Sequence, residues 1–425
     1  MFGIYFYTFV QISNFLRIIL TNNTSDTIMI TISERISNLS ESETLAMTRL
    51  CKKLKVQGYD VINLGIGEPD FNTPEHIKQA AKDAIDQNFT HYPPVCGYPE
   101  LLDAICQKFK RENNLDFKPE NILVSTGAKQ SIANIVLSLL DPYDEVIIPV
   151  PYWVSYKEVI KLADAKPIYI TAGIKNDFKI TPKQLEKAIT PETKLFIFSS
   201  PCNPTGSVYS KEELKALADV FVLHEQVYIL SDEIYEHINF NGGHETIAQF
   251  ENIRNRVIIV NGVSKSFAMT GWRIGYMAAL PEIVEACNKL QGHVTSGACS
   301  IAQKAALAAL TGDLSSVKTM LKAFHERRDH LVKLLNEIPG MKTNIPQGAF
   351  YVFPDVTYYF GKTDGKVTIT NAPELCDYIL NKVYVALVPG NAFGDPNCIR
   401  LSYATSKDIL TEAIHRIKKA LADLY

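Results

Sequence analysis

The 425-residue sequence predicts an α/β protein with a mostly parallel seven-stranded sheet, helices on both faces of that sheet, and a smaller α+β domain. From residue 120 onward, short runs rich in β-branched residues alternate with stretches of helical length. The runs are apolar almost continuously, which is typical of strands covered on both faces. Because strands that alternate with helices favour a parallel sheet, these two observations define the class. The alternation stops near residue 310, which indicates the second domain.

Seven runs are predicted strands. They are NILVS (121–125), EVIIPV (145–150), KPIYIT (166–171), KLFIFS (194–199), VYILS (227–231), RVIIVN (256–261) and IGYMAAL (274–280). Helical stretches lie between them, such as 128–140 and 210–226. The second begins with Ser210 and Glu213 at the spacing of a capping box, in which each side chain accepts a hydrogen bond from the other residue's backbone N–H.

After residue 310 the pattern predicts a long amphipathic helix over 313–338, an extended segment GAFYVFPDV (348–356), a helix near 373–382 and two further short extended segments. No repeat or flexible linker interrupts the chain. We therefore divide it as follows: 1–30, an N-terminal extension; 31–72, a segment packing with the small domain; 73–310, the large domain; 311–425, the small C-terminal domain.

Composition excludes several classes. The chain is 46% hydrophobic and 21% charged, with a net charge of −3, which fits a globular protein and not a disordered one. It has no basic stripe of the kind that binds nucleic acid. The eight cysteines form no C-x-x-C pair and the nine histidines show no ligand spacing, so we expect reduced thiols, a cytoplasmic location and no metal.

Residues 2–20 are apolar enough to suggest a signal segment or a membrane anchor. Gln11, Ser13, Asn14 and Arg17 interrupt the run, no positive charge precedes it, and no small-residue cleavage site follows it. This favours an upstream extension, with a true start at Met29, over a membrane device. A membrane-tethered protein remains the alternative.

Ligands of parallel α/β sheets bind beyond the carboxyl ends of the strands, so the residues after each run carry the functional prediction. STGAKQ (125–130) follows the first strand and leads into a helix. Free backbone N–H groups and the helix dipole make such a turn an anion site, and Lys129 adds positive charge. Many helices begin in this way, so the turn alone is weak evidence.

Trp153 follows the second strand, where its face could cover a flat ring, although ordinary core packing explains it as well. Asn203, in PCNPTG (201–206), offers an amide to a polar group, but the composition of this segment is also simply that of a turn.

Asp232 ends the fifth strand, and a buried carboxylate is costly unless it meets a cation or caps a helix. Tyr235 could turn its hydroxyl to the same place. After the sixth strand come Ser264 and Lys265, then Arg273. A lysine there is either a solvated strand end or an amine held dry for chemistry.

Together these strand ends offer an anion cradle, an aromatic cover, an amide, a carboxylate and an amine. Pyridoxal phosphate fits all five. Lys265 would condense with its aldehyde, helped by a pKa lowered in a dry, cation-rich pocket. Asp232 would keep the ring nitrogen protonated, so that the ring accepts the electrons left when a Cα proton departs. Lys265, once released, would move that proton.

With these residues placed, the chain resembles the fold-type I pyridoxal-phosphate aminotransferases, and among them the bacterial aspartate aminotransferase subgroup of aspartate/prephenate type. Six ordered motifs carry the resemblance over about residues 33–425. They are GEPDF (67–71), PYWVSY (151–156), NPTG (203–206), SDEIYEH (231–237), SKSFAMTGWRIGY (264–276) and RLSYATS (400–406).

The resemblance implies a role for each matching residue. The catalytic residues would be Lys265, as the Schiff-base lysine, Asp232, as the partner of the ring nitrogen, and Tyr235. Cofactor binding would involve Gly127, Ala128, Lys129, Trp153, Asn203, Asp232, Tyr235, Ser264, Lys265, Arg273 and, from the other subunit of a dimer, Tyr92. Substrate binding would involve Gly67, Trp153, Asn203, Arg400, Lys129 and, from the neighbouring chain, Ser296. Arg400 would take the α-carboxylate as a bidentate pair, while Lys129 and Ser296 would hold the distal one.

One departure concerns the substrate. Relatives often have KPSAT near the N-terminus, with a lysine that helps to recognise dicarboxylates and, in some members, prephenate, whereas this chain has SESET (40–44) with Ser40 in the lysine's place. The resemblance therefore implies a cytoplasmic homodimer that transfers the amino group of L-aspartate to 2-oxoglutarate. Prephenate or aromatic transamination and β-elimination remain alternatives. So does a silent scaffold, although such a protein would lack Lys265 or Asp232, and both are present.

Overall fold

The computed structural model describes residues 18–20, 28–30, 32–41 and 43–425 and divides into two compact units, 1–40 and 41–425. In the first unit, β1 (Ile18–Leu20) pairs with β2 (Ile28–Ile30) in antiparallel fashion, and α1 spans Glu34–Ser37. Most of the segment predicted to be an N-terminal extension lies outside the described residues. Among the described helices, none combines the length and the apolar character needed to cross a membrane.

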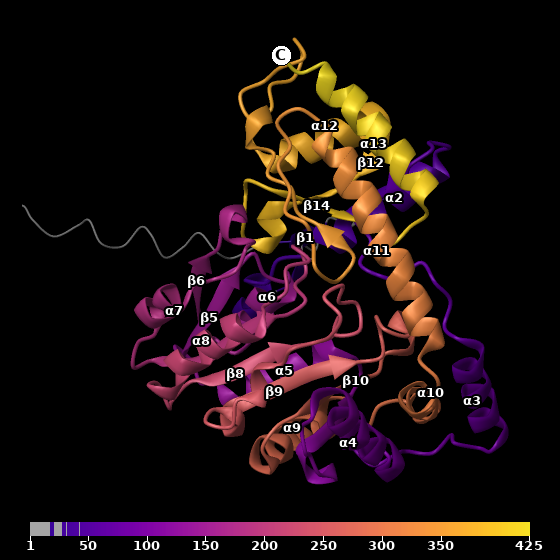
Figure 1. Ribbon diagram of the computed structural model, residues 1–425, viewed down its shortest axis with the longest axis vertical. Coiled ribbons are helices and arrows are strands. Elements are labelled where there is room, and N and C mark those ends of the chain that lie inside the picture. The colour runs from indigo at the N-terminus through magenta and orange to yellow at the C-terminus, as the bar shows by residue number, and fades with distance from the viewer. Residues whose placement is uncertain (1–17, 21–27, 31, 42) are drawn as a thin grey trace, which may run out of the picture. The chain divides into compact units, whose positions relative to one another are not determined.

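The second unit is built around a seven-stranded sheet, as predicted (Figure 1). Its strands are β4 (Ile122–Ser125), β5 (Glu145–Val150), β6 (Lys166–Thr171), β7 (Thr193–Ser199), β8 (Tyr228–Asp232), β9 (Val257–Gly262) and β10 (Gly275–Ala278). Their order in the sheet is β4-β10-β9-β8-β7-β5-β6. Only β10 runs against its neighbours, so the other six strands end at the same edge.

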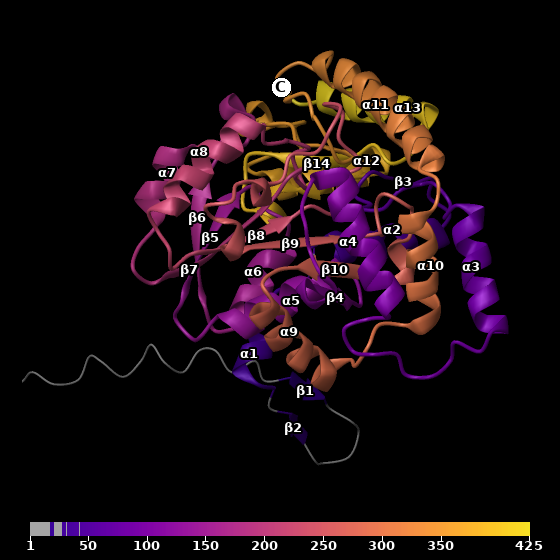
Figure 2. The same ribbon diagram turned by 60° about the horizontal axis from the view of Figure 1, so that its bottom comes forward.

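Helices cover both faces of this sheet (Figure 2). They are α3 (Glu75–Asp86), α4 (Pro99–Asn113), α5 (Ala128–Leu139), α6 (Ser155–Leu162), α7 (Pro182–Ala188), α8 (Lys211–Val222), α9 (Pro281–Val294) and α10 (Ser300–Thr311). Successive residues of a strand enter different cores: Ile147 belongs to the core that includes α4, α8 and α10, while Val146 and Ile148 belong to the one that includes α5, α6 and α9. This alternation explains why the strand sequences are apolar without interruption.

The predicted capping box begins α8. The backbone N–H of Glu213 donates to Oγ of Ser210 at 3.2 Å, and the backbone N–H of Ser210 donates to Oε2 of Glu213 at 2.8 Å. Such a cap stabilises a helix by about 1 kcal/mol. The helix ends at Val222, four residues earlier than the predicted stretch.

The elements after residue 310 pack around a core that Leu64, Ile234, Tyr235 and Ile238 also join. The elements are α11 (Ser315–Asn336), β11 (Tyr351–Val352), α12 (Ala372–Val383), β12 (Val385–Ala386), β13 (Val388–Pro389), β14 (Ile399–Ser402) and α13 (Lys407–Ala422). The segment before the large domain includes α2 (Glu43–Val56) and β3 (Ile62–Asn63). Strand β3 pairs with β12 in parallel. Residues 62–63 thus join the C-terminal elements. The exact domain division at residues 72/73 and 310/311 stays a prediction.

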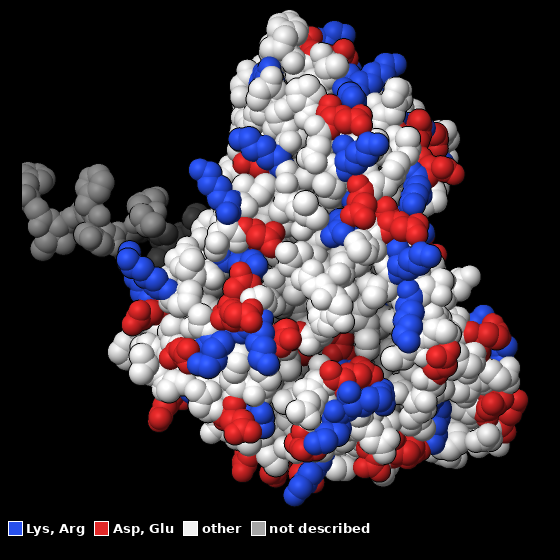
Figure 3. Space-filling model, viewed as in Figure 1, with Lys and Arg blue, Asp and Glu red and all other residues white. Residues whose placement is uncertain are grey.

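Lys and Arg side chains are interspersed with Asp and Glu on the face of the molecule shown in Figure 3. All eight cysteines are free thiols.

Candidate active site

The carboxyl edge of the sheet brings the predicted residues together. Asp232 is the last residue of β8, and Lys265 lies in the turn after β9, the adjacent parallel strand. β10 returns beside β9 and places Gly275 opposite both Gly262 and Ser125, so the loop after β4 reaches the same place. Strand order therefore unites three loops far apart in sequence.

Lys265 is held away from bulk water. Its Nζ donates a hydrogen bond to the carbonyl oxygen of Gly67 at 2.6 Å and lies 5.8 Å from the centre of the Tyr235 ring. Burial lowers the pKa of this amine to about 8, against the opposing effect of the Glu68 carboxylate. The neutral, nucleophilic fraction of the amine near neutral pH is consequently much larger than for an ordinary lysine.

Asp232 is 5% exposed. Its Oδ2 accepts a hydrogen bond from the Tyr156 hydroxyl at 2.7 Å, and its Oδ1 accepts one from the backbone N–H of Ile234 at 3.2 Å. Burial raises the pKa of the carboxyl to about 6, and the Tyr156 hydrogen bond opposes this rise. The charges of Asp232 and Lys265 each affect the pKa of the other, as expected for side chains that face one site.

The turn after β4 forms an open cradle. Gly127, the N-cap of α5, has a φ of 79° and provides no side-chain cap, so the first N–H groups of the helix stay available. A Cβ at this glycine would lie 2.3 Å from Nη2 of Arg273. Only glycine therefore allows the guanidinium to approach the helix start so closely, and the two together suit a phosphate.

Lys129 and Trp153 lie next to this cradle. Nζ of Lys129 is 5.0 Å from the centre of the Trp153 ring, within the range of a cation–π contact. Burial, followed by the positive charge of Arg273, lowers the pKa of Lys129. Two neighbouring cations indicate that this side of the site receives an anion.

Arg400, in β14, enters the site from the C-terminal elements and is 2% exposed. Its Nη1 donates to Oδ1 of Asn203 at 2.9 Å and its Nη2 donates to the carbonyl oxygen of Gly65 at 2.7 Å. Its Nε is buried and has no hydrogen-bond partner. A buried guanidinium without a carboxylate partner is prepared to receive one from a ligand.

Tyr235 and Tyr351 join the same group, with their hydroxyl oxygens 2.8 Å apart. The Arg400 guanidinium lies over the Tyr351 ring at 4.5 Å. A Cβ on Gly67 would lie 3.2 Å from the Tyr351 hydroxyl, so Gly67 also stands at this position. Ser264, the residue before Lys265, is buried.

The chain does not bring two of the predicted residues into its own site. Tyr92 is 94% exposed. Ser296 has a left-handed backbone, with a φ of 61°, and makes its backbone hydrogen bond to Gln291. Both were predicted to act from a neighbouring subunit, and this role stays a prediction.

Sequence reasoning missed Tyr156, Tyr351 and Glu68 as site residues. Tyr351 was interpreted only as part of an extended segment, and Glu68 was noted only within a motif. Tyr156 follows Trp153 by three residues, at the start of α6. This spacing, which places two side chains on one side of a helical turn, could have indicated Tyr156 as a site residue.

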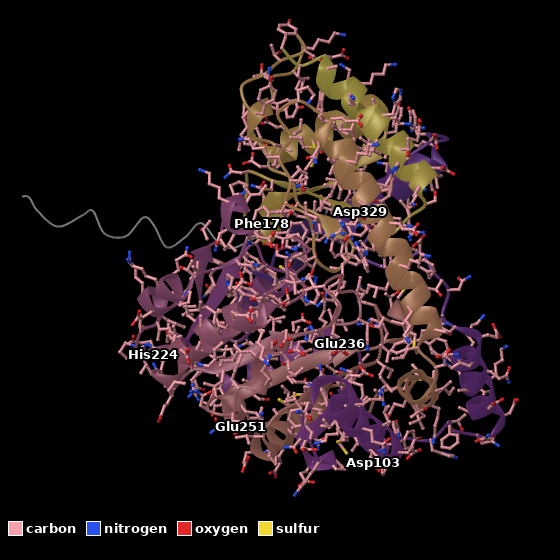
Figure 4. The ribbon with its side chains drawn as sticks, in the orientation of Figure 1. Asp103, Phe178, His224, Glu236, Glu251 and Asp329 are labelled. Carbon is pink, nitrogen blue, oxygen red and sulfur yellow. The ribbon has the colours of Figure 1, made fainter. Side chains whose placement is uncertain are left out.

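A buried charge cluster lies behind Asp232 and Tyr235. Glu236, labelled in Figure 4, is contacted by Nζ of Lys108. The same Nζ lies 3.6 Å from Glu112, whose carboxylate accepts a hydrogen bond from His237 at 2.9 Å. Nδ1 of His237 lies 2.9 Å from the hydroxyl of Ser266, the residue after Lys265. The cluster thus links the segment that carries Asp232 to the loop that carries Lys265.

Glu233 and His244 extend this cluster, with His244 Nε2 at 2.9 Å from the Glu233 carboxylate. Burial alone would raise the pKa of Glu236, but Lys108 and the two histidines hold it at about 2. The side chains of this cluster thus lie close enough together to resemble metal ligands, although no spacing in the sequence suggested them as such. Lys108 already neutralises the carboxylate at their centre.

The residues present fit pyridoxal phosphate. The cradle with Gly127 and Arg273 matches a phosphate, Asp232 matches a protonated ring nitrogen, and Lys265 supplies the amine. The Nε of Arg400, buried and without a hydrogen-bond partner, marks a further place for a carboxylate.

The comparison with known families agrees with this geometry. The family described as aminotransferase class I and II matches residues 59–417, and the chain belongs to this family. The predicted resemblance to fold-type I aminotransferases is thus confirmed.

Particular relatives are more specific. The chain is 48% identical over 402 residues to the bifunctional aspartate aminotransferase and glutamate/aspartate-prephenate aminotransferase of Petunia hybrida, covering 93% of this chain and 84% of the relative. Among solved structures, the aspartate aminotransferase of Rhizobium meliloti matches with a TM-score of 0.90 and 43% identity, covering 93% of this chain and 100% of that one. The aspartate aminotransferase of Thermus thermophilus with maleate matches with a TM-score of 0.87 and 39% identity, covering 92% and 100%.

Proposed function

We propose that this protein is an aspartate aminotransferase, which transfers the amino group between L-aspartate and 2-oxoglutarate and gives oxaloacetate and L-glutamate. The observation that carries the proposal is a buried arginine with a free Nε, Arg400, in the same site as the amine of Lys265 and the carboxylate of Asp232. The bound cofactor, pyridoxal phosphate, supplies an electron sink that stabilises the charge left when a Cα proton departs.

The side chains divide the remaining work. Arg400 binds the α-carboxylate, held by Asn203 and the Gly65 carbonyl in a fixed orientation. Lys265 accepts the Cα proton and returns it, because its pKa of about 8 lies near the working pH. Asp232 remains an anion that faces the ring nitrogen, and Trp153 covers the ring.

The second carboxylate of the substrate selects for dicarboxylic acids. We assign Lys129 to this carboxylate, and burial, followed by the charge of Arg273, lowers its pKa. Prephenate transamination is the second candidate, supported by the printed name of the Petunia hybrida relative. Ser40 in place of the lysine of KPSAT favours aspartate over prephenate.

The experiment that tests the function is a half-reaction titration of the purified protein carrying its cofactor. L-Aspartate, L-glutamate, an aromatic amino acid and prephenate with an amino donor are each followed by the cofactor's absorbance. We expect aspartate and glutamate to give the largest kcat/KM. Release of ammonia and pyruvate without an oxo-acid acceptor would instead identify a β-elimination lyase.

We further propose a cytoplasmic homodimer with shared active sites. The almost complete exposure of Tyr92 in the single chain supports a partner surface there, and the eight free thiols support a reducing compartment. Tyr92 would reach the partner's phosphate, and Ser296 the partner's distal carboxylate. Sedimentation of the protein tests whether it is a dimer. If Tyr92 reaches the partner's phosphate, Tyr92→Phe should weaken cofactor affinity only in the dimer.

Arg400→Lys is expected to lower kcat/KM for aspartate by about 100-fold, because lysine keeps the charge but loses the two-pronged contact with a carboxylate. Steady-state kinetics with aspartate measure the effect. Arg416→Lys is the matched control, since Arg416 pairs with Glu412 and Asp60 outside the site. Equal kinetics of Arg400→Lys and the wild type would contradict the assignment.

Cofactor uptake by the apoenzyme is expected to depend on pH through Lys265. Only the neutral amine attacks the aldehyde, and burial lowers its pKa to about 8, so the rate of uptake rises with pH and levels off above about 8. An ordinary lysine would show a rise that continues beyond pH 10. Stopped-flow absorbance at a series of pH values distinguishes the two curves.

A further inference from the structure

Tyr156 has no assigned role among the residues above, yet its hydroxyl makes the shortest hydrogen bond to Asp232. We propose that Tyr156 is a positioning residue that keeps the Asp232 carboxylate ionised and aimed at the ring nitrogen of the cofactor. The inference rests on the proposed function, because it concerns the same cofactor site.

The geometry fixes the Tyr156 side chain tightly. The residue is 1% exposed, in the first turn of α6, and its backbone N–H donates to the carbonyl oxygen of Trp153 at 3.0 Å. The rings of Trp153 and Tyr156 are 5.5 Å apart and nearly perpendicular, at 80°. The proposed ring cover, Trp153, thus lies just before α6, and the donor to Asp232 lies in the first turn of that helix.

The Tyr156 hydroxyl remains a hydrogen-bond donor at neutral pH and well above it. Burial, and then the charge of Asp232, raise the pKa of its hydroxyl well above the ordinary value, so it keeps its proton. A hydrogen bond from a neutral donor to a carboxylate stabilises the anion and opposes the effect of burial. Without it, Asp232 would retain only the weaker backbone contact to Ile234 at 3.2 Å.

Among the described residues, none of the other groups that affect the pKa of Asp232 replaces this donor. Glu233 raises its pKa, and Lys265 lowers it from the loop after β9 as the last and smallest of the named effects. The Tyr235 hydroxyl is hydrogen-bonded to that of Tyr351. The thiol of Cys202, after β7, is half-buried and stays uncharged because its pKa is raised. Tyr156 is consequently the main influence on Asp232 that favours the ion.

The test uses the apoenzyme and two cofactors, pyridoxal phosphate and its 1-deaza analogue, in which a C–H group replaces the ring nitrogen. Tyr156→Phe removes one oxygen atom. We expect it to weaken binding of pyridoxal phosphate by about 10- to 100-fold, the usual effect of losing a hydrogen bond to a charged group. Binding of the analogue should not change, because the analogue has no nitrogen for Asp232 to hold.

A pH series supplies a second readout. The hydrogen bond from Tyr156 lowers the pKa of Asp232, so its removal must raise that pKa. In the wild type we expect the affinity for pyridoxal phosphate to fall on acidification near pH 6. In Tyr156→Phe this fall should occur at a higher pH. In an Asp232→Ala background the tyrosine change should cost nothing. Tyr152→Phe is the matched control, since the Tyr152 ring stacks on Tyr169.

Each outcome is decisive. Equal losses with both cofactors would mean that Tyr156 is only a packing residue, and no loss with either would remove it from the site. If Tyr156→Phe does not fold, Tyr156→His, which keeps a donor, replaces it and must preserve the preference for pyridoxal phosphate. If the wild-type protein binds the two cofactors equally well, the proposed function itself is overturned. If the wild type prefers pyridoxal phosphate and Tyr156→Phe keeps the same preference, only the role of Tyr156 is overturned.

Discussion

Replacing Lys265 with alanine is expected to lower turnover by about 10⁴-fold or more, because the change removes both the nucleophile that binds the cofactor and the base that moves the Cα proton. The amine is the group best prepared for both tasks, since burial lowers its pKa to about 8. Half-reaction kinetics with aspartate measure the loss. The visible absorbance of covalently bound cofactor should disappear with it.

Binding and chemistry can be separated in this variant. The Gly127 and Arg273 cradle and the Asp232 carboxylate remain, so Lys265→Ala should still bind pyridoxal phosphate without a covalent bond. Lys166→Ala is a suitable control, because Lys166 begins β6 at the opposite edge of the sheet and pairs with Glu145. Turnover of Lys265→Ala within tenfold of the wild type would refute the assigned role.

Lys108→Met is expected to have the largest effect on stability. The side chain of Lys108 is fully buried and contacts Glu236, which is buried as well. Removing one partner of such a pair leaves an uncompensated charge in the interior, at a cost of about 3–5 kcal/mol in the free energy of unfolding. Denaturant unfolding of the apoenzyme, followed by far-ultraviolet circular dichroism, measures this cost.

The double variant Lys108→Met/Glu236→Gln distinguishes charge from packing. It removes both charges, so we expect it to regain a large part of the lost stability. Lys110→Met is the matched control on the same helix, because Lys110 pairs with Asp116 on the surface, where an ion pair contributes about 0–1 kcal/mol. A double variant as unstable as Lys108→Met would show that packing, and not the buried charge, decides the effect.

Much of the fold could be predicted because it depends on local patterns. The seven strands follow from continuous apolar runs, and their observed ends lie within two residues of the predicted ones. The Ser210 cap was equally local, since it involves residues three apart. Lys265 and Asp232 were recognisable because each follows a strand, and parallel strands end at one edge.

The contacts that tune the site could not be predicted in this way. The hydrogen bond from Tyr156 to Asp232 joins residues 76 apart, and that from Arg400 to Asn203 joins residues 197 apart. Their distances depend on strand order and on the C-terminal elements that bring β14 to the sheet. A pattern along the chain carries no information about such partners.

The sequence by itself therefore determined which elements form and which side chains carry the chemistry, because hydrophobic periodicity and strand ends are properties of consecutive residues. Only the tertiary structure decided that Lys108 is buried against Glu236, and that a tyrosine hydroxyl donates a hydrogen bond to Asp232. The physical reason is that the protonation state of a buried group depends on every charge and donor around it, and those neighbours are assembled by packing.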